Sequence, residues 1–376
     1  MPATIKDVAR AAGVSVATVS RAMNGADNVL PDTKARILAA ARDLRFSPSG
    51  AARSLITRRT DTIGALLPDL HGEYFSELIR GIDQAARARG LHLLVSSSHG
   101  DADEAAAALR SMNGRVDGLL VMSPHADAAF LSANLPHNLP AVLINTGIDL
   151  PGHASFKVDN FGGAQAMTRH LAALGCKRIA FIGGPDGNHE AQERLRGYRA
   201  GLRAATPKGL TEALFDGDFS EAAGWAAGRK MVQAKGRPDA VFAANDMMAV
   251  GCLAALAEAG LRVPKDIAVV GFDDIPIARY VTPALSTIRV PIAALGAAAL
   301  ETLAQGLQSV PPVPSTPSVP SVPSVLNDAA AVRVMPVELV IRASCGGGPP
   351  VHPWPPSMSP SMSPSMPPNA PPTAHH

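Results

Sequence analysis

The chain has 376 residues, with 34 Lys and Arg against 32 Asp and Glu, which gives a formal net charge of +2. The composition, 47% hydrophobic and 18% charged, excludes a disordered chain and is typical of a soluble globular protein with two or three domains. The longest apolar run, Met247 to Ala257, is too short to span a bilayer. Three widely separated cysteines argue against a disulfide framework or a zinc ribbon. Since no basic and apolar leader opens the chain, we expect a cytoplasmic protein.

The first 25 residues predict two short helices around a tight turn. Thr4 is placed to cap the first helix, and Asp7, three residues later, completes a variant of the capping box. Gly13 then ends this helix, and Ser15 can cap the second one. Such a pair of helices is also found in any small helical hairpin, so the caps alone leave the function open.

The second predicted helix has two different faces. Val19 and Met23 fall on the inner face, where we expect them to pack against Val8 and Ala12. The outer face consists of Val16, Ala17, Ser20 and Arg21. Small residues, a hydroxyl and an arginine suit a helix that enters a DNA major groove, which is the helix-turn-helix arrangement.

The distribution of charge supports a DNA partner. Residues 1–60 contain ten Lys and Arg and four Asp, a net charge of +6, so the remainder of the chain carries −4. A basic module joined to a mildly acidic body favours binding to a phosphate backbone. A third helix is predicted from Pro31 to Leu44, with Leu30 where a polar cap is usual.

From Thr62 onward, short apolar runs alternate with amphipathic stretches. This alternation predicts parallel sheets covered by helices, in two doubly wound α/β lobes with a ligand cleft between them. The expected strands are 62–67, 91–96, 118–122, 141–145, 178–183, 240–243, 267–272 and 286–290. The expected helices are 75–89, 102–112, 162–174, 191–205, 222–234, 246–259 and 293–305.

Several motifs resemble those of the lactose-repressor (LacI/GalR) family of bacterial transcription regulators. The opening motif runs from Ile5 to Gly25 without a gap, and the others are Glu193–Tyr198, Ala244–Ala249, Val270–Pro276 and Thr282–Thr287, in the family's order. The resemblance implies a three-helix helix-turn-helix domain, a hinge, and two lobes of the periplasmic-binding-protein type. It also implies a regulator, expected to be a repressor, that binds a palindromic operator as a homodimer under the control of a small-molecule effector.

The resemblance and the composition together divide the chain. We expect a DNA-binding domain at 1–46, a hinge helix or linker at 47–60 and an effector-binding and dimerisation domain at 61–344. Within the last, 310–330 is a Pro- and Ser-rich insertion, and 335–344 resembles the family's last strand. Residues 345–376 form a disordered tail without leucine heptads, so a dimer is expected rather than a coiled-coil tetramer.

The resemblance assigns two sets of site residues. Those for DNA are Thr4, Ser15, Val16, Ala17, Thr18, Ser20, Arg21, Asn24 and, as a minor-groove wedge in the hinge, Leu55. Those for the effector are Phe75, Arg194, Phe219, Asn245 and Asp273. Alternatively, Arg194 and Asp273 form a structural ion pair, and the two aromatic residues belong to the core.

A sugar is the expected effector. Arg194, Asn245 and Asp273 supply donors and acceptors that suit sugar hydroxyls, and an aromatic ring at Phe219 can stack on a sugar face. Asn188 stands where the purine-binding branch of the family has an arginine that reads the base. No cofactor or metal is expected.

Two other classes of protein remain as alternatives: an α/β enzyme, and a sugar-binding protein without a regulatory role on DNA. The sequence has no phosphate-loop, nucleophile-elbow or zinc-protease motif, and its histidines and acids are scattered. We therefore expect no enzymatic activity.

Overall fold

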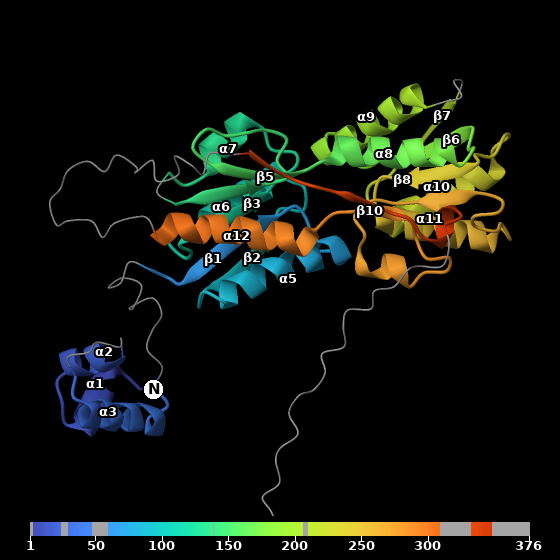
Figure 1. Cartoon of the computed structure of the whole chain (residues 1–376). Coiled ribbons are helices and arrows are strands. Elements are labelled where there is room, and N and C mark those ends of the chain that lie inside the picture. The colour runs from blue at the N-terminus through green and yellow to red at the C-terminus, as the bar shows by residue number, and fades with distance from the viewer. Residues whose placement is uncertain are drawn as a thin grey trace, which may run out of the picture.

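A computed structural model describes residues 3–23, 29–46, 59–137, 139–205, 210–308 and 332–347 (Figure 1). Asn24, Leu55, the insertion at 310–330 and the tail beyond Gly347 lie outside the described residues, as does the hinge except for its last two residues. Among the described residues, no helix is both long and apolar enough to cross a membrane.

The N-terminal domain consists of three helices, α1 (Ile5–Ala12), α2 (Val16–Met23) and α3 (Pro31–Asp43). The Asp7 carboxylate accepts hydrogen bonds from the backbone N of Thr4 (3.0 Å) and from its hydroxyl (2.7 Å), so the predicted capping box is confirmed. Gly13 ends α1 in the left-handed conformation, with φ of 65°. Leu30 precedes α3 without a side-chain cap, as predicted.

A small apolar core holds these helices together. Val8, Val19 and Ile37, one from each helix, are completely buried, and Met23 packs against them from the edge. This confirms the inner face predicted for α2 and leaves its opposite face outside the core.

The rest of the described chain forms two α/β lobes. The first lobe contains a six-stranded parallel sheet in the order β11-β5-β4-β3-β1-β2, and the second a four-stranded parallel sheet in the order β7-β6-β8-β9. An antiparallel pair, β10 and β12, lies beside the second sheet. The strands are β1 (Thr62–Leu67), β2 (His92–Ser97), β3 (Gly118–Met122), β4 (Ala141–Ile144), β5 (Ala154–Val158), β6 (Arg178–Ile182), β7 (Thr211–Phe215), β8 (Ala240–Ala243), β9 (Ala268–Val270), β10 (Thr287–Arg289), β11 (Val332–Met335) and β12 (Glu338–Val340).

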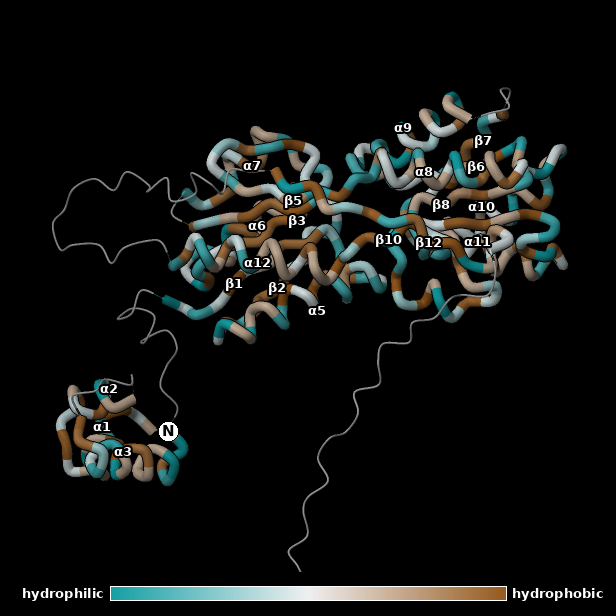
Figure 2. Tube along the Cα trace, in the orientation of Figure 1, coloured by the Kyte–Doolittle hydropathy of each residue, from teal (hydrophilic) through white to brown (hydrophobic). Residues whose placement is uncertain are grey.

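Helices cover both sheets, and the strands at the centre of each lobe are largely hydrophobic (Figure 2). Buried apolar residues fill the space between helices and strands. Helices α5, α6, α7 and α12 belong to the first lobe, and α8 to α11 belong to the second. Their bounds are α5 (Glu73–Arg87), α6 (Ala102–Met112), α7 (Ala128–Asn134), α8 (Asn160–Ala173), α9 (His189–Ala204), α10 (Glu221–Gln233), α11 (Asp246–Glu258) and α12 (Ile292–Gln308), with short 3₁₀ turns at Pro276–Arg279 and Ala343–Cys345.

Glycines let α10 and α11 pack closely. A Cβ atom at Gly224 would lie 2.0 Å from the carbonyl oxygen of Met248, and one at Gly251 would lie 1.9 Å from that of Glu221. Any side chain at these two positions would therefore force the helices apart.

The chain crosses between the lobes three times, after β5, after β10 and after β11. Asp159 follows the first crossing strand, Val290 and Pro291 follow the second, and Pro336 and Val337 follow the third. The lobes also touch at the rim, where the backbone N of Ile277 donates to Glu73 Oε2 at 2.8 Å.

Most predicted strands and helices are confirmed within two residues, but β5, β7 and α7 are absent from the prediction. Three of the five residues of β7 are exposed, Glu212 among them, and β5 includes Lys157, so neither strand shows a continuous apolar run. The prediction of one last strand at 335–344 is wrong, because Pro336 separates β11 from β12, which pair in different lobes.

The folded part of the chain also continues past the predicted start of the tail. Cys345 is buried, with its Sγ 3.1 Å from Ser286 Oγ and 3.5 Å from His170 Nε2. Ser344 Oγ donates to the carbonyl of Val269 at 2.6 Å. The prediction that the disordered tail begins at Cys345 is therefore too early.

Candidate functional site

The outer face of α2 is accessible. Val16, Ala17 and Arg21 are exposed, whereas Thr18 and Ser20 are half-buried. Ser15 caps this helix, since its Oγ accepts from the backbone N of Thr18 at 3.1 Å and lies 2.8 Å from the Thr18 hydroxyl. The described part of the predicted DNA-binding set thus lies on α2 and at the exposed start of α1, where Thr4 is engaged with Asp7.

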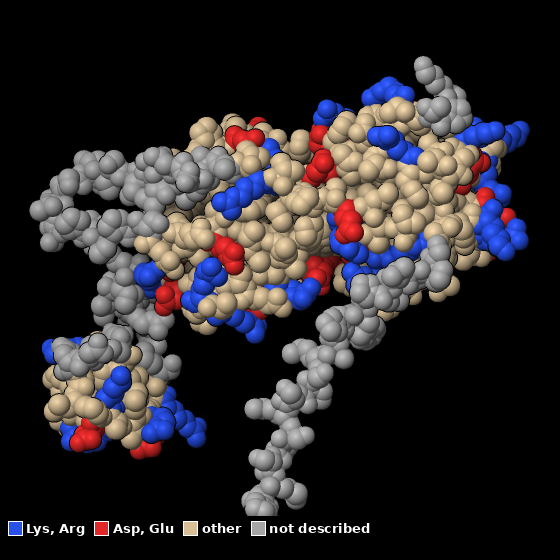
Figure 3. Space-filling view, viewed as in Figure 1, with Lys and Arg blue, Asp and Glu red and all other residues tan. Residues whose placement is uncertain are grey.

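The N-terminal domain presents basic side chains on its surface (Figure 3). Among its described residues, seven Lys and Arg stand against three Asp. Arg10 is paired with Asp7 at 3.1 Å, and this pair is exposed enough to be screened by salt. The net positive charge and the accessible face of α2 form a surface that can bind a nucleic-acid backbone.

In the second lobe, Arg194 on α9 is almost completely buried and has partners on all sides. Its Nε donates to Asn160 Oδ1 at 2.8 Å, and its Nη1 donates to the carbonyl of Ala244 at 2.6 Å. Its Nη2 lies 3.1 Å from Asp273 Oδ1. The guanidinium also stacks on the ring of Phe272, 3.9 Å from its centroid. Arg194 and Asp273 thus form the structural ion pair considered as the alternative above.

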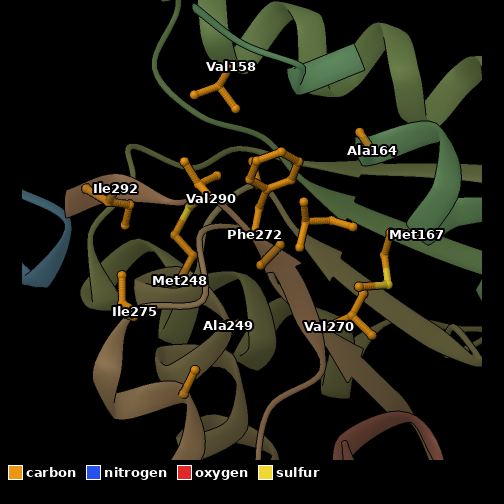
Figure 4. Packing of buried hydrophobic residues seen from close by; sticks show 14 of the residues in the cluster. Val158, Ala164, Met167, Met248, Ala249, Val270, Phe272, Ile275, Val290 and Ile292 are labelled. Atoms are coloured by element: carbon orange, nitrogen blue, oxygen red, sulfur yellow. The ribbon is translucent and has the colours of Figure 1, made fainter. Parts of the chain in front are cut away.

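Phe272 links this ion pair to the core. The ring lies at the centre of the view in Figure 4, with Val290 and Met248 of the same buried cluster around it. Because Val290 follows β10 at a lobe crossing, the packing that holds the guanidinium in place extends to the connection between the lobes.

Asn245 also has a structural role. Its Oδ1 accepts from the backbone N of Met248 at 3.0 Å, which caps α11, and its Nδ2 donates to the carbonyl of Phe219 at 2.9 Å. Phe219 is held with φ of 73°, and Asp273 with φ of 115°. Strained backbone held by surrounding contacts is common at binding sites.

The structure brings three further residues to the cleft that the sequence analysis did not select. Tyr74 on α5 and Asn145 after β4 come from the first lobe, and Asn145 Nδ2 donates to Tyr74 Oη at 3.0 Å. Glu190 in the first turn of α9 comes from the second lobe. Asn145 and Glu190 are more than nine-tenths buried, and Asn145 Oδ1 and Glu190 Oε1 have no hydrogen-bond partner.

Asn145 and Glu190 line a cavity of about 200 Å³ between the lobes. It extends along the first crossing, past Lys157 of β5 and Asp159, to His189 and Glu193 of α9. Lys157 Nζ is paired with Asp149 at 2.8 Å, and Asn188, beside the cavity, caps α9 by accepting from the backbone N of Ala191 at 3.0 Å.

Burial controls the ionisation of the cleft carboxyl groups. It raises the pKa of Glu190 from 4.5 to about 7, against the opposing effects of the Arg194 charge and of a side-chain hydrogen bond with Asn160, and the nearby Asp273 raises it further. Burial likewise raises the pKa of Asp273 to about 6, opposed by Arg194. Burial together with the charges of Glu190 and Asp273 raises the pKa of Tyr74, which places these groups near one another.

The two predicted aromatic residues are half-buried. Phe75 packs against the core with its ring edge-on to Tyr74, 5.4 Å between centroids, and Phe219 lies beside Gly184. Glu190, Asn145 and Tyr74 could have been found from their place next to the carboxyl ends of strands or at helix starts, where parallel sheets bind ligands. Among the described residues, no group of three or more His, Cys, Asp or Glu could hold a metal.

Comparisons with known proteins agree with these sites. Residues 4–49 match the family described as bacterial regulatory proteins, lacI family, and residues 168–345 match the periplasmic binding protein-like domain. An HTH-type transcriptional repressor PurR from Edwardsiella ictaluri is 36% identical over 350 residues, which are 92% of this chain and 98% of that protein.

Two solved structures share the fold across both parts of the chain. A lac repressor dimer bound to operator and the anti-inducer ONPF has a TM-score of 0.76 at 28% identity, covering 92% of this chain and 99% of that one. A transcriptional regulator CelR–cellobiose complex has a TM-score of 0.62 at 27% identity, and the match covers 91% of this chain and 99% of that one.

These relatives are transcription regulators and not enzymes, so the enzyme alternative is set aside. The helix-turn-helix domain likewise sets aside a sugar-binding protein without a role on DNA. The chain belongs to the LacI family of bacterial transcription repressors, with a DNA-binding helix-turn-helix domain followed by an effector-binding domain.

Proposed function

We propose that this protein is a dimeric repressor whose affinity for a palindromic operator is set by a sugar in the cleft between its two lobes. The observation that carries the effector part is the pair of buried, unpaired oxygens, Asn145 Oδ1 and Glu190 Oε1, which belong to residues that line the same cavity from different lobes. A ligand with several hydrogen-bond donors satisfies both oxygens and contacts both lobes.

Two observations favour a sugar over a purine. The sugar-bound CelR complex shares the fold, which supports a carbohydrate in the equivalent cleft here. Asn188 uses its side chain to cap α9 and is not directed to a ligand. The similarity to PurR repressors favours a nucleobase as the second candidate, and the same experiment tests it.

On the DNA side, we propose contacts from Thr4, Ser15, Thr18, Ser20 and Arg21, with Val16 and Ala17 contacting thymine methyls or deoxyribose. Asn24 and Leu55 complete the proposed set. The proposed domains are 1–46 for DNA, 47–60 for the hinge and residues from 61 to the end of the fold for the effector and dimer contacts. The proposed place of action is chromosomal DNA in the cytoplasm, where repressors of this family bind.

The test begins with selection of bound duplexes from a random library by the purified full-length protein. We expect an inverted repeat to be enriched, and gel-shift titrations on it to show two subunits per site. The titrations are then repeated with a panel of sugars and nucleobases. Failure to enrich any inverted repeat at moderate salt overturns the operator proposal, and a response to nucleobases alone overturns the sugar assignment.

A further inference from the structure

The unpaired buried groups of the cleft are all of one chemical kind. Among the described residues, the buried side-chain atoms without a hydrogen-bond partner are oxygens only. Two of them, Asn145 Oδ1 and Glu190 Oε1, belong to residues that line the cavity, whereas Asp273 Oδ1 is ion-paired with Arg194 at 3.1 Å. The buried nitrogens are already used: Arg194 by Asn160, Ala244 and Asp273, and the amides of Asn145 and Asn245 by Tyr74 and Phe219. The unpaired groups around Asn145 and Glu190 are therefore acceptors, and the Tyr74 hydroxyl is the donor beside them.

The charge of the cleft has the same bias. Two buried carboxyl groups, Glu190 and Asp273, share one buried cation, Arg194, which is already 3.1 Å from Asp273. The other charged or titratable groups facing Glu190 and its cavity are Tyr74, Lys157, Asp159, His189 and Glu193. The Lys157 ammonium is already paired with the carboxylate of Asp149. With a neutral ligand, the Glu190 carboxylate would have to share the counter-charge of Arg194 with Asp273.

A hydroxyl group and an ammonium group fit such a site differently. A hydroxyl donates one hydrogen bond and also needs donors for its lone pairs, whereas an ammonium has three donors and no acceptor. An unpaired buried carboxylate is costly, and a cation with directed donors removes that cost. Asn145 Oδ1 and Glu190 Oε1 supply acceptors from both sides of the cavity.

We propose that the effector carries a protonated amine, as in an amino sugar, which binds between Glu190 and Asn145. The proposal rests on the sugar-controlled function proposed above and narrows its ligand class. Glu190 supplies the counter-charge from the second lobe, and Asn145 supplies a neutral acceptor from the first lobe. The ammonium group therefore contacts both lobes at once.

The probes are three matched pairs: D-glucosamine with D-glucose, D-galactosamine with D-galactose, and D-mannosamine with D-mannose. Binding is measured by calorimetry and thermal shift on the full-length wild-type protein. At least one amine is expected to bind about tenfold or more tightly than its neutral parent, because a hydrogen-bonded charge pair replaces a neutral contact.

Glu190→Gln tests the proposed counter-charge without changing the shape of the site. This variant is expected to bind the preferred amine at least about tenfold more weakly and to bind the amine and its parent alike. Glu104→Gln, at an exposed side chain of α6 in the first lobe, is the matched control and should behave as wild type. Its folding and that of Glu190→Gln are checked by circular dichroism.

The outcomes separate this proposal from the function proposed above. If no amine binds, if each neutral parent binds as tightly as its amine, or if Glu190→Gln keeps the wild-type preference, the proposal of an amine is overturned. Binding of an inverted-repeat operator by the same preparation, measured without ligand, shows whether the repressor function stands independently of that result.

Discussion

Replacing Glu190 by glutamine should stabilise the ligand-free protein above neutral pH. Burial raises the pKa of Glu190 from 4.5 to about 7 in the folded protein. Between these values the folded chain holds a proton that the unfolded chain has already released, so stability falls as the pH rises through this window. Above it, the folded protein carries the full cost of the buried charge.

The magnitude follows from the size of the shift. A rise from 4.5 to about 7 corresponds to about 3 kcal/mol, at about 1.4 kcal/mol per unit. Glutamine has nearly the same shape and no charge to bury. The difference in the free energy of unfolding, Glu190→Gln minus wild type, should therefore be about 2–3 kcal/mol larger at about pH 8 than at about pH 5. The neighbouring Asp273, with its own raised pKa, is present in both proteins and largely cancels in the comparison.

The assay is urea unfolding of both proteins, without ligand, across this pH range, followed by far-ultraviolet circular dichroism. We expect the free energy of unfolding of the wild-type protein to fall toward high pH, and that of Glu190→Gln to change less with pH. If the two curves run parallel, Glu190 is ionised and paired in the folded protein at every pH tested. The reasoning from its unpaired Oε1 would then be refuted.

Three more predictions follow from single contacts. Arg21→Ala, which removes an exposed cation from α2, should weaken operator binding by about 1–3 kcal/mol in gel-shift titrations; unchanged affinity would remove Arg21 from the DNA surface. Gly224→Ala should lower the free energy of unfolding by at least about 1–3 kcal/mol in urea titrations, because its Cβ would lie 2.0 Å from the Met248 carbonyl oxygen, and wild-type stability would contradict this close approach. Asp274→Asn should lower the free energy of unfolding by about 3–5 kcal/mol in the same assay, because the carboxylate is fully buried and lies 2.6 Å from the Arg342 guanidinium. A loss below about 1 kcal/mol would show that the arginine finds other partners.

Local signals in the sequence were sufficient for the helix-turn-helix domain. The capping box at Thr4, the left-handed Gly13 and the buried Val19 each follow from short-range rules, and each is present in the structure. The parallel strands could be predicted for a related reason, since strands such as β3 are apolar at every position and buried on both faces. Edge strands lack this signal, which is why β7 was not predicted.

The cleft was harder to predict, because the roles of its residues depend on partners distant in the sequence. Arg194 and Asp273 were selected as ligand contacts, yet the structure satisfies the guanidinium through Asn160 and Ala244 as well as Asp273. Glu190 was not selected, because its significance lies in an oxygen left unpaired after folding, which no pattern of residues reveals. Whether Arg194 and Asp273 also contact the effector stays a prediction.

The same unpaired oxygens give a physical reason for coupling between ligand and lobe arrangement. With the lobes as close as they are here, Asn145 Oδ1 and Glu190 Oε1 are buried without a hydrogen-bond partner, at a cost of about 1–3 kcal/mol for each oxygen. A ligand that satisfies both oxygens removes this cost only in an arrangement that brings both of them to it, as here, so it favours that arrangement by a few kcal/mol. The site lies next to the first crossing, at Asp159 and Asn160, so a small rotation about the three crossings separates Asn145 from Glu190. The energy that the ligand transmits therefore comes from these two unpaired oxygens, and a variant that satisfies them internally should lose ligand control while keeping its affinity for DNA.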